Sequence, residues 1–291
     1  MSFRPKVVRV KRYALEGVQT RLLELPSESS VLVLPGADWL PHEAHELEVD
    51  AEGLAQVVAT DLRARPARVP LFNGRALSFR SAPKLAHGDC VSFGSSVSAS
   101  FLAAECYDPG LEARLADDVD ARAVYADALE EAGDPLGEAI ALAGPDGAPP
   151  SWVLHETRLP LLEIDVSWNA GFAEQAQVSL LESAVYPAGI LRVLYARVFA
   201  ALRSLTVRID VARAIERPLD ARLAAHLPPS LREFQLIVGQ REAPPRDEVD
   251  ALLNRVRERC PAVEATVTVD PSRAEPSVER MRFNLRGKSL K

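Results

Sequence analysis

Hydrophobic and polar positions alternate in short runs over the first hundred residues. Between Val8 and Ala104 the runs are RVKRYAL, TRLLEL, SVLVL, ELEV, AQVVATDL, VPLF, CVSF and SASFLAA, separated by proline, glycine or serine. A period of two is typical of strands with one buried face, and many short strands at this spacing indicate a sandwich or a barrel. We therefore predict a β-sandwich over residues 1–106.

Two stretches of this region have the composition of tight turns. Asn73-Gly74 lies inside LFNGRAL, and this pair favours a type I′ hairpin turn with positive φ at both central residues. Gly88-Asp89, inside KLAHGDCVSFG, is expected to turn the chain before a strand that ends at Gly94.

The apolar positions take helical spacing after Pro109. They recur at i, i+3, i+4, i+7 and i+8, which is one face of an amphipathic helix. The residues of this stripe are Ala121, Val124, Tyr125, Ala128 and Leu129. Asp127, Glu130 and Glu131 lie off the stripe and are expected to face solvent.

Local signals place the ends of this helix and begin a second one. Asp118 or Asp120 can cap the first helix, and Gly133 suits the left-handed position that ends it. Asp134-Pro135 supplies an N-cap and a first-turn proline for a second helix, which carries Ile140 and Leu142 and stops near Gly144. The two helices are predicted to form a hairpin.

Three later segments each run from a helical portion into a short strand. They are LYARVFAALRSLTVRI (194–209), LAAHLPPSLREFQLIV (223–238) and LLNRVRERCPAVEATVTV (252–269). A Leu-x-x-apolar-x-apolar core begins at Leu202 and again at Leu231, 29 residues later, and an earlier strand from Phe172 to Leu180 would make a fourth unit. Stacked units of this kind predict a short, curved parallel sheet.

The alternation inside these strands separates a core face from an outer face. Leu205 and Val207 are expected to point into the core. The outward residues, which are our candidates for contact with a partner, are Thr206, Arg208, Gln235 and Ile237. A plain solvated sheet face is the alternative.

Together the patterns predict a multidomain protein of mixed β and α/β class. The predicted parts are a β-sandwich at 1–106, an acidic helical hairpin at 107–150, an α/β repeat-like domain at 151–270 and a basic tail at 271–291.

Charge is unevenly distributed along the chain. The formal net charge is −7, and residues 105–138 carry eleven acids against Arg114 and Arg122. A general nucleic-acid binder needs a basic surface, so nucleic acid is not expected as a partner. The basic tail, with Arg280, Arg282 and Arg286, is the one segment that could make such a contact.

Cysteine usage and hydropathy predict a cytoplasmic protein. Cys90, Cys106 and Cys260 are widely spaced and odd in number, which argues against a disulfide framework or a zinc site. The charged N-terminal stretch has no apolar run that could serve as a signal peptide. The most apolar stretch, 185–202, is interrupted by Arg192 and Arg197, so no membrane insertion is expected.

Patterns that carry catalysis are missing from the sequence. No nucleophile elbow, phosphate loop, dinucleotide fingerprint or kinase signature occurs. His42 and His45 are three residues apart, whereas a zinc helix needs four. Cys260 has arginines nearby that could lower its pKa, yet no base partner can be assigned. We predict no catalytic residue, no metal site and no cofactor; an enzyme with a carboxylate site in the acidic segment is the alternative.

Residues 8–104 resemble the forkhead-associated domain, a β-sandwich that binds phosphothreonine peptides. The resemblance is carried by Asp61-Leu62, Asn73-Gly74, the stretch from Leu85 to Gly94 and the strand from Ser98 to Ala103. The family's Gly-Arg and Ser-x-x-His become Gly36-Ala37 and His42-Glu43-Ala44-His45, and Arg63-Ala64-Arg65-Pro66-Ala67-Arg68 replaces its Ser-x-Asn-Gly-Thr loop.

This resemblance implies a set of candidates for phosphopeptide binding. The guanidinium fork suits phosphate well, so three arginines of the replaced loop could still provide donors. The candidates are Arg63, Arg65, Arg68, Asn73 and His42. The alternatives are that these arginines are surface charges of a loop and that the sandwich is a degenerate protein-binding domain.

Residues 117–142, DDVDARAVYADALEEAGDPLGEAIAL, resemble the bacterial repeat-companion domain. Ala128 stands where that family has tryptophan, and Ala139 where it has phenylalanine. The family is associated with leucine-rich and similar repeats and has no established catalytic role. The resemblance therefore implies leucine-rich-repeat-like units beyond the hairpin.

We predict a non-enzymatic protein–protein interaction or adaptor protein in bacterial regulatory or signalling assemblies. Its partner is expected to be another protein. The first alternative is a phosphothreonine-dependent binding module that acts with a serine/threonine kinase, in which case the partner is phosphorylated.

Overall fold

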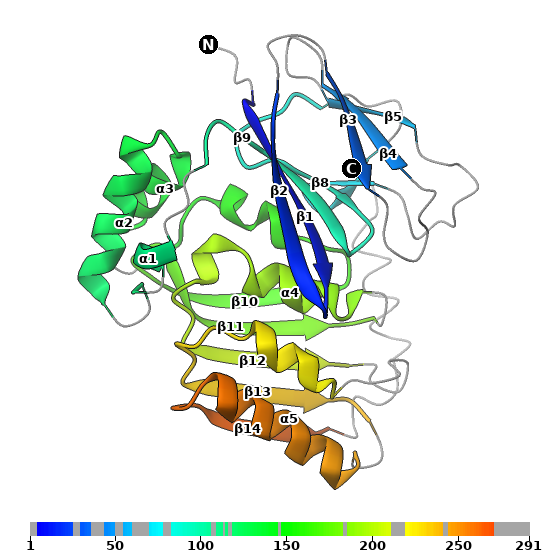
Figure 1. Cartoon of the computed structure of the whole chain (residues 1–291), viewed down its shortest axis with the longest axis vertical. Coiled ribbons are helices and arrows are strands. Elements are labelled where there is room, and N and C mark those ends of the chain that lie inside the picture. Colours follow the sequence, from blue (N-terminus) through cyan, green and yellow to red (C-terminus); the bar gives the residue numbers. More distant parts are fainter. Residues whose placement is uncertain are drawn as a thin grey trace, which may run out of the picture. The chain divides into compact units, whose positions relative to one another are not determined.

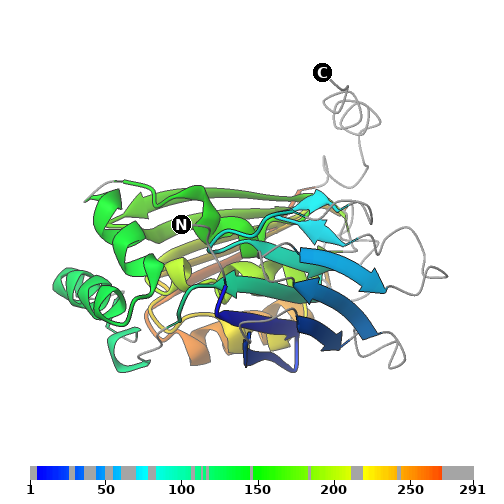
Figure 2. The same cartoon turned by 90° about the horizontal axis from the view of Figure 1, so that it is seen from above.

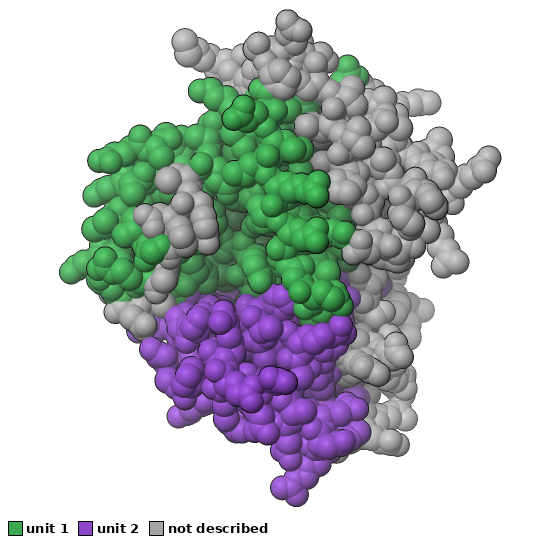
Figure 3. All heavy atoms as spheres, in the orientation of Figure 1, with its two compact units in different colours: residues 1–160, 167–174, 187–201 green, residues 161–166, 175–186, 202–291 purple. Residues whose placement is uncertain are grey.

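The computed structural model of the chain describes most of its first 270 residues. The described ranges are 5–25, 30–35, 44–49, 55–59, 70–77, 83–105, 109–112, 114–115, 118–144, 147–182, 185–210, 219–240 and 244–270. The chain divides into two compact units (Figure 3). Unit 1 comprises Met1–Pro160, Ser167–Glu174 and Pro187–Ala201, and unit 2 comprises Leu161–Val166, Gln175–Tyr186 and Leu202–Lys291. The boundaries proposed after residues 106, 150 and 270 stay predictions.

The first part of unit 1 contains a six-stranded antiparallel sheet with the order β2-β1-β9-β8-β6-β7. Its strands β1, β2, β8 and β9 are labelled in Figure 1. Asn73 and Gly74 join the short strands β6 and β7 with φ angles of 50° and 79°, so the predicted type I′ turn is confirmed. The strands are β1 (Val7–Ala14), β2 (Gly17–Glu24), β6 (Leu71–Phe72), β7 (Arg75–Ala76), β8 (Cys90–Phe93) and β9 (Val97–Leu102).

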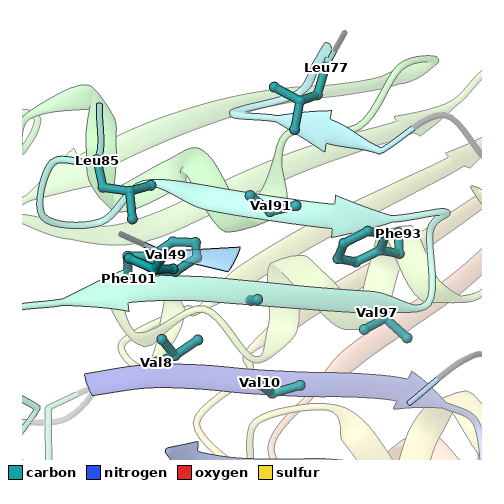
Figure 4. Packing of buried hydrophobic residues seen from close by; sticks show 10 residues of the cluster. Val8, Val10, Val49, Leu77, Leu85, Val91, Phe93, Val97 and Phe101 are labelled. Carbon is teal, nitrogen blue, oxygen red and sulfur yellow. The ribbon is translucent and has the colours of Figure 1, made fainter. Parts of the chain in front are cut away.

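A second antiparallel sheet has the order β3-β4-β5 and comprises β3 (Ser30–Pro35), β4 (Ala44–Val49) and β5 (Ala55–Ala59). Val49 of β4 belongs to the same buried cluster as Val8, Val91 and Phe101 from the larger sheet (Figure 4). Both sheets therefore contribute side chains to one hydrophobic core. Each of the eight alternating runs contains a strand.

The predicted helical hairpin is present, with its predicted caps. It consists of α2 (Val119–Glu131) and α3 (Pro135–Ala143), preceded by the short helix α1 (Pro109–Glu112). The Asp118 side chain accepts from the Ala121 N–H at the start of α2, and Asp134 accepts from the Leu136 N–H at the start of α3. Gly133, with φ of 72°, turns the chain between them.

The apolar stripe predicted for α2 is wrong in part. Val124 is 53% exposed, and Leu142 on α3 is 73% exposed. On α2, Arg122 and Ala126, which were not in the predicted stripe, are buried. The buried face of α2 is therefore rotated relative to the predicted one, because the Arg122 side chain turns inward and donates to the carbonyl oxygens of Leu115 and Asn169.

The third sheet contains five strands in the order β10-β11-β12-β13-β14, and the last four are parallel. Gln175 pairs with Ser204, which pairs with Glu233, so equivalent positions lie 29 residues apart, as the repeat spacing predicted. The first strand, β10, was not predicted. The strands are β10 (Leu162–Asn169), β11 (Phe172–Leu180), β12 (Ser204–Ile209), β13 (Glu233–Val238) and β14 (Glu264–Val269).

Helical segments connect the parallel strands. In unit 2, the 3-10 helix η6 (Ala221–His226) precedes β13 and α5 (Arg246–Arg259) precedes β14. Both lie on the same face of the sheet (Figures 1 and 2). In unit 1, η2 (Ser151–Thr157), α4 (Ala188–Leu194) and η4 (Arg197–Phe199) complete the described helices of residues 151–201. Among the described residues, we find no helix with the length and apolarity that a membrane crossing requires.

Candidate functional site

The outer face of strands β11 to β14 carries side chains in regular rows. Because neighbouring strands pair in register, equivalent outward residues lie directly beside one another. We call this surface the open sheet face and define it by two rows. The first row is Gln177, Thr206, Gln235 and Thr266, and the second is Ser179, Arg208, Ile237 and Thr268.

Burial along the strands follows the predicted alternation. Leu205 and Val207 are at most 1% exposed, whereas Thr206 and Arg208 between and beyond them are only half-buried. In β13, Phe234 and Leu236 are equally buried, and Gln235 and Ile237 are half-buried. The predicted orientation of all four partner-face candidates is thus confirmed, while their part in binding stays a prediction.

The side chains of the two rows are polar except for Ile237, and the adjoining row on the same face adds the exposed acids Glu233 and Glu264. Among the eight side chains of the two rows, Arg208 alone carries a charge. The amides of Gln177 and Gln235 and the hydroxyls of the threonines can each donate and accept hydrogen bonds. Since η6 and α5 pack on the opposite face, no described helix of unit 2 covers these rows. Sequence reasoning found only the middle two strands of this face, because the candidates were taken from the two clearest repeats.

A second polar cluster is buried on the six-stranded sheet of unit 1. In β1, Val8 and Val10 face the hydrophobic core, so Arg9, Lys11 and Tyr13 face the other way. Glu156 of η2 meets all three side chains. It lies 2.8 Å from Arg9 Nη2 and 2.9 Å from Lys11 Nζ, and it accepts a hydrogen bond from the Tyr13 hydroxyl.

The charges around Glu156 determine its ionisation. Burial alone would raise the pKa of the Glu156 carboxyl, but the Lys11 and Arg9 charges outweigh burial and lower that pKa to about 2. Arg9 forms a further ion pair with Glu105 at 2.6 Å. The carboxylate is thus ionised at neutral pH, where it compensates two buried cations.

Arg192 of α4 completes this cluster and is fully buried. Its guanidinium donates to the carbonyl oxygens of Ser95 (2.7 Å), Val97 (2.7 Å) and Glu156 (2.9 Å), and to the Ser92 hydroxyl (2.9 Å). All three guanidinium nitrogens of Arg192 therefore donate to groups of the protein itself. We interpret the cluster as a structural contact that holds η2 and α4 against the sheet. Sequence reasoning missed it, although a charged residue inside the most apolar stretch was its signal.

The acidic hairpin contains an ordered polar contact around Arg197. Arg197 donates from Nη1 to Asp134 Oδ2 at 2.7 Å and from Nη2 to the Tyr125 hydroxyl at 2.8 Å. The Tyr125 hydroxyl in turn donates to Glu112 at 2.6 Å. Asp127, Glu130, Glu131 and Glu138 are exposed instead, as predicted for the first three. Two carboxylates of this segment, Asp134 and Glu112, therefore lie around Arg197, while these four exposed acids make no cluster with them.

One candidate for phosphopeptide binding lies in the described residues. The Asn73 side chain donates to Asp89 Oδ1 at 2.7 Å and accepts from the Cys90 N–H at 2.8 Å, so both ends of its amide hold the turn against β8. Arg63, Arg65, Arg68 and His42 lie outside the described residues.

The described residues bear on two further possibilities, a reactive Cys260 and a metal site. Burial raises the pKa of the Cys260 thiol, against the opposing effect of Arg259 and Arg232, so the expected lowering is wrong. The thiol donates to the Pro228 carbonyl at 3.3 Å. Within the described ranges, no group of three or more histidine, cysteine, aspartate or glutamate side chains could hold a metal ion.

Comparison with known proteins gives no assignment for this geometry. No protein-family model, no curated protein and no solved structure matches the chain.

Proposed function

We propose that the chain is a non-enzymatic binding protein that recognises another protein through the open sheet face. The single observation that carries this proposal is the in-register stacking of β11 to β14, with mainly polar side chains, from buried Ser179 to exposed Thr266 and Thr268, in rows on one face. Stacked repeats bury a continuous core and leave an extended face, and such faces are used to bind partners.

The composition of the open sheet face favours a protein partner over a small anion or a nucleic acid. Phosphate groups are bound by clusters of arginine or lysine, and Arg208 is the single cation of the two rows. Amides and hydroxyls at fixed spacing instead match the backbone and side-chain groups of a protein surface.

We interpret residues 202–238 as degenerate leucine-rich-repeat-like units. Leu202, Leu205 and Val207 are buried together, and so are Leu231, Phe234 and Leu236. The likeness of residues 117–142 to the repeat-companion domain agrees with this interpretation. In this proposal the hairpin is structural, since Arg122 donates to the Leu115 carbonyl at 2.9 Å and to the Asn169 carbonyl at 3.2 Å.

The forkhead-associated-like part is proposed to be a degenerate sandwich that binds a second protein. Two antiparallel sheets that share a core and an Asn-Gly hairpin turn support this interpretation. The protein would then act as a cytoplasmic adaptor in a bacterial signalling assembly.

The test is a quantitative capture from the native host with the full chain as bait. The face variant combines Thr206→Lys with Gln235→Glu, which are neighbours in one row and keep the net charge. The matched control combines Ala123→Lys with Ala141→Glu at exposed helix positions. A partner held by the wild type and the control but lost at least about tenfold by the face variant supports the proposal. Equal recovery by both variants overturns it.

Phosphatase treatment of the host extract separates the phosphothreonine alternative from this proposal. Recognition through the open sheet face predicts that recovery is unchanged after treatment. Loss of the partner on dephosphorylation, with the face variant still able to bind, favours the forkhead-associated-like part as the binding site.

A further inference from the structure

Strand β14 forms one edge of the five-stranded sheet. The Glu264 N–H donates to the Arg232 carbonyl of the chain entering β13, and the Asp270 N–H donates to the Val238 carbonyl. Even-numbered residues thus direct their backbone groups at β13. The odd-numbered residues Ala265, Val267 and Val269 direct their N–H and C=O groups away from the sheet, towards an edge where no described strand pairs with them.

The composition of β14 does not protect this edge. Natural edge strands are commonly protected by charged residues, proline or bulges. The sequence of β14 is EATVTV, with one charge at its first residue and β-branched residues at four positions. Strand β10, at the opposite edge, carries the exposed acids Glu163 and Asp165. The two edges therefore differ, and β14 is the one suited to pairing.

The inner side chains of β14 are incompletely covered. Ala265, Val267 and Val269 are half-buried, whereas the equivalent residues of β13, such as Phe234 and Leu236, are fully buried. A further strand at this edge would cover them with apolar side chains of its own. The occupant therefore needs both an extended backbone and an apolar inner face.

The helix beside this edge, α5, has two halves of opposite charge. Its first half contains Arg246 with three acids, and its second half contains Glu258 with three arginines. All eight of these side chains are exposed; the acids are Asp247, Glu248 and Asp250, and the arginines are Arg255, Arg257 and Arg259. An antiparallel arrangement of two such helices places each acidic half beside a basic half, which is charge complementarity of the chain with itself.

We propose that two copies of this chain pair through their β14 strands, antiparallel, about a two-fold axis perpendicular to the sheet. Pairing Ala265 with Val267 of the second copy aligns the outward N–H and C=O groups of both strands. In this register, Glu264 lies opposite Thr268 of the second copy, so that no two acids meet within the strands. The two α5 helices then lie on the same face, in the antiparallel arrangement.

This dimer is separate from the proposed function and is tested by sedimentation of the full chain over a concentration series. The wild type is expected to reach twice the chain mass of 31.7 kDa. Val267→Pro removes an outward N–H, which makes no bond to β13, and is expected to be monomeric with unchanged circular dichroism. The face variant, Thr206→Lys with Gln235→Glu, leaves β14 intact and is expected to remain dimeric.

A charge exchange on α5 keeps the proposal testable if Val267→Pro fails to fold. Asp247→Lys with Glu248→Lys makes both halves of α5 basic and is expected to give monomers. Adding Arg255→Glu with Arg257→Glu exchanges the two halves and is expected to restore the dimer. A wild type that stays monomeric at its highest soluble concentration overturns the proposal. So does a folded Val267→Pro variant that remains dimeric, or a charge exchange that restores nothing.

Discussion

A buried arginine inside an apolar stretch connects three segments that are distant in the sequence. Arg192 donates to carbonyl groups at Ser95 and Val97, and to the carbonyl of Glu156. Sequence reasoning treated Arg192 only as a charge that excludes a membrane span. Glu156 is 36 residues away, and Ser95 and Val97 are nearly one hundred, so no local pattern could identify these partners.

Glu156 gives the clearest pH dependence at the scale of a residue. Its pKa in the folded protein, about 2, is below its ordinary value of 4.5, so the folded state favours the ionised form. Its contribution to stability is complete above pH 4.5 and is lost as the pH falls from about 4.5 to 2. The free energy of unfolding of the wild type should decrease over this interval.

Glu156→Gln removes this dependence. We expect it to lower the free energy of unfolding at pH 7 by about 3–5 kcal/mol, because the buried Arg9 and Lys11 lose their counter-charge. Urea unfolding at several pH values gives the difference between wild type and variant. A difference that stays constant from pH 7 to pH 2 contradicts the assignment.

Asp134 makes two stabilising interactions, a helix cap and an ion pair, and two substitutions can separate their contributions. It caps α3 through the Leu136 N–H and forms an ion pair with Arg197. Asp134→Asn keeps a capping oxygen but loses the charge, and should cost about 2 kcal/mol. Asp134→Ala loses both, and should cost about 1 kcal/mol more. Equal losses for the two variants in urea unfolding would show that the cap contributes nothing.

At the scale of elements, local signals predicted the hairpin better than they predicted its packing. The caps at Asp118 and Asp134 and the turn at Gly133 depend on neighbouring residues, and all three are present. The buried face of α2 depends on tertiary contacts of Arg122, and it was predicted wrongly at Val124. Strand β10 was missed although its sequence, LEIDVSWN, alternates visibly.

The packing of α2 against α3 depends on a glycine. A Cβ at Gly137 would lie 2.5 Å from the Ala126 carbonyl oxygen and 2.6 Å from the Glu130 nitrogen. Gly137→Ala should force the helices apart and lower the free energy of unfolding by about 2–3 kcal/mol. The control is Gly133→Ala, which meets no neighbouring atom and should cost about 1 kcal/mol through its positive φ. Thermal and urea unfolding rank the two variants, and the reverse order would contradict this account.

The alternation in β13 is tested by two adjacent substitutions. Leu236→Ala removes a fully buried side chain and should lower the free energy of unfolding by about 2–5 kcal/mol. Gln235→Ala changes the open sheet face and should cost about 1 kcal/mol or less. Similar losses at both positions in urea unfolding would mean that this face is not open to solvent.

At the scale of the whole molecule, the mixed β and α/β composition was predictable because both periods are visible in the sequence. The parallel order of the repeated strands was predicted from their helix-to-strand pattern, and the register reproduces the 29-residue spacing from β11 to β13. Between β13 and β14 the spacing is 31 residues. The function was harder to predict from the sequence. The open sheet face is defined by the side chains that point to solvent, and no sequence motif marks them. Four of the phosphopeptide candidates, Arg63, Arg65, Arg68 and His42, lie outside the described residues.

The most direct measurement is the affinity of the purified chain for the protein recovered by capture. Calorimetric titration should give the same Kd for the wild type and for the control with Ala123→Lys and Ala141→Glu. The variant with Thr206→Lys and Gln235→Glu should bind at least about tenfold more weakly, a loss of about 1.4 kcal/mol. An unchanged Kd for this folded face variant would contradict the claim that the open sheet face binds the partner.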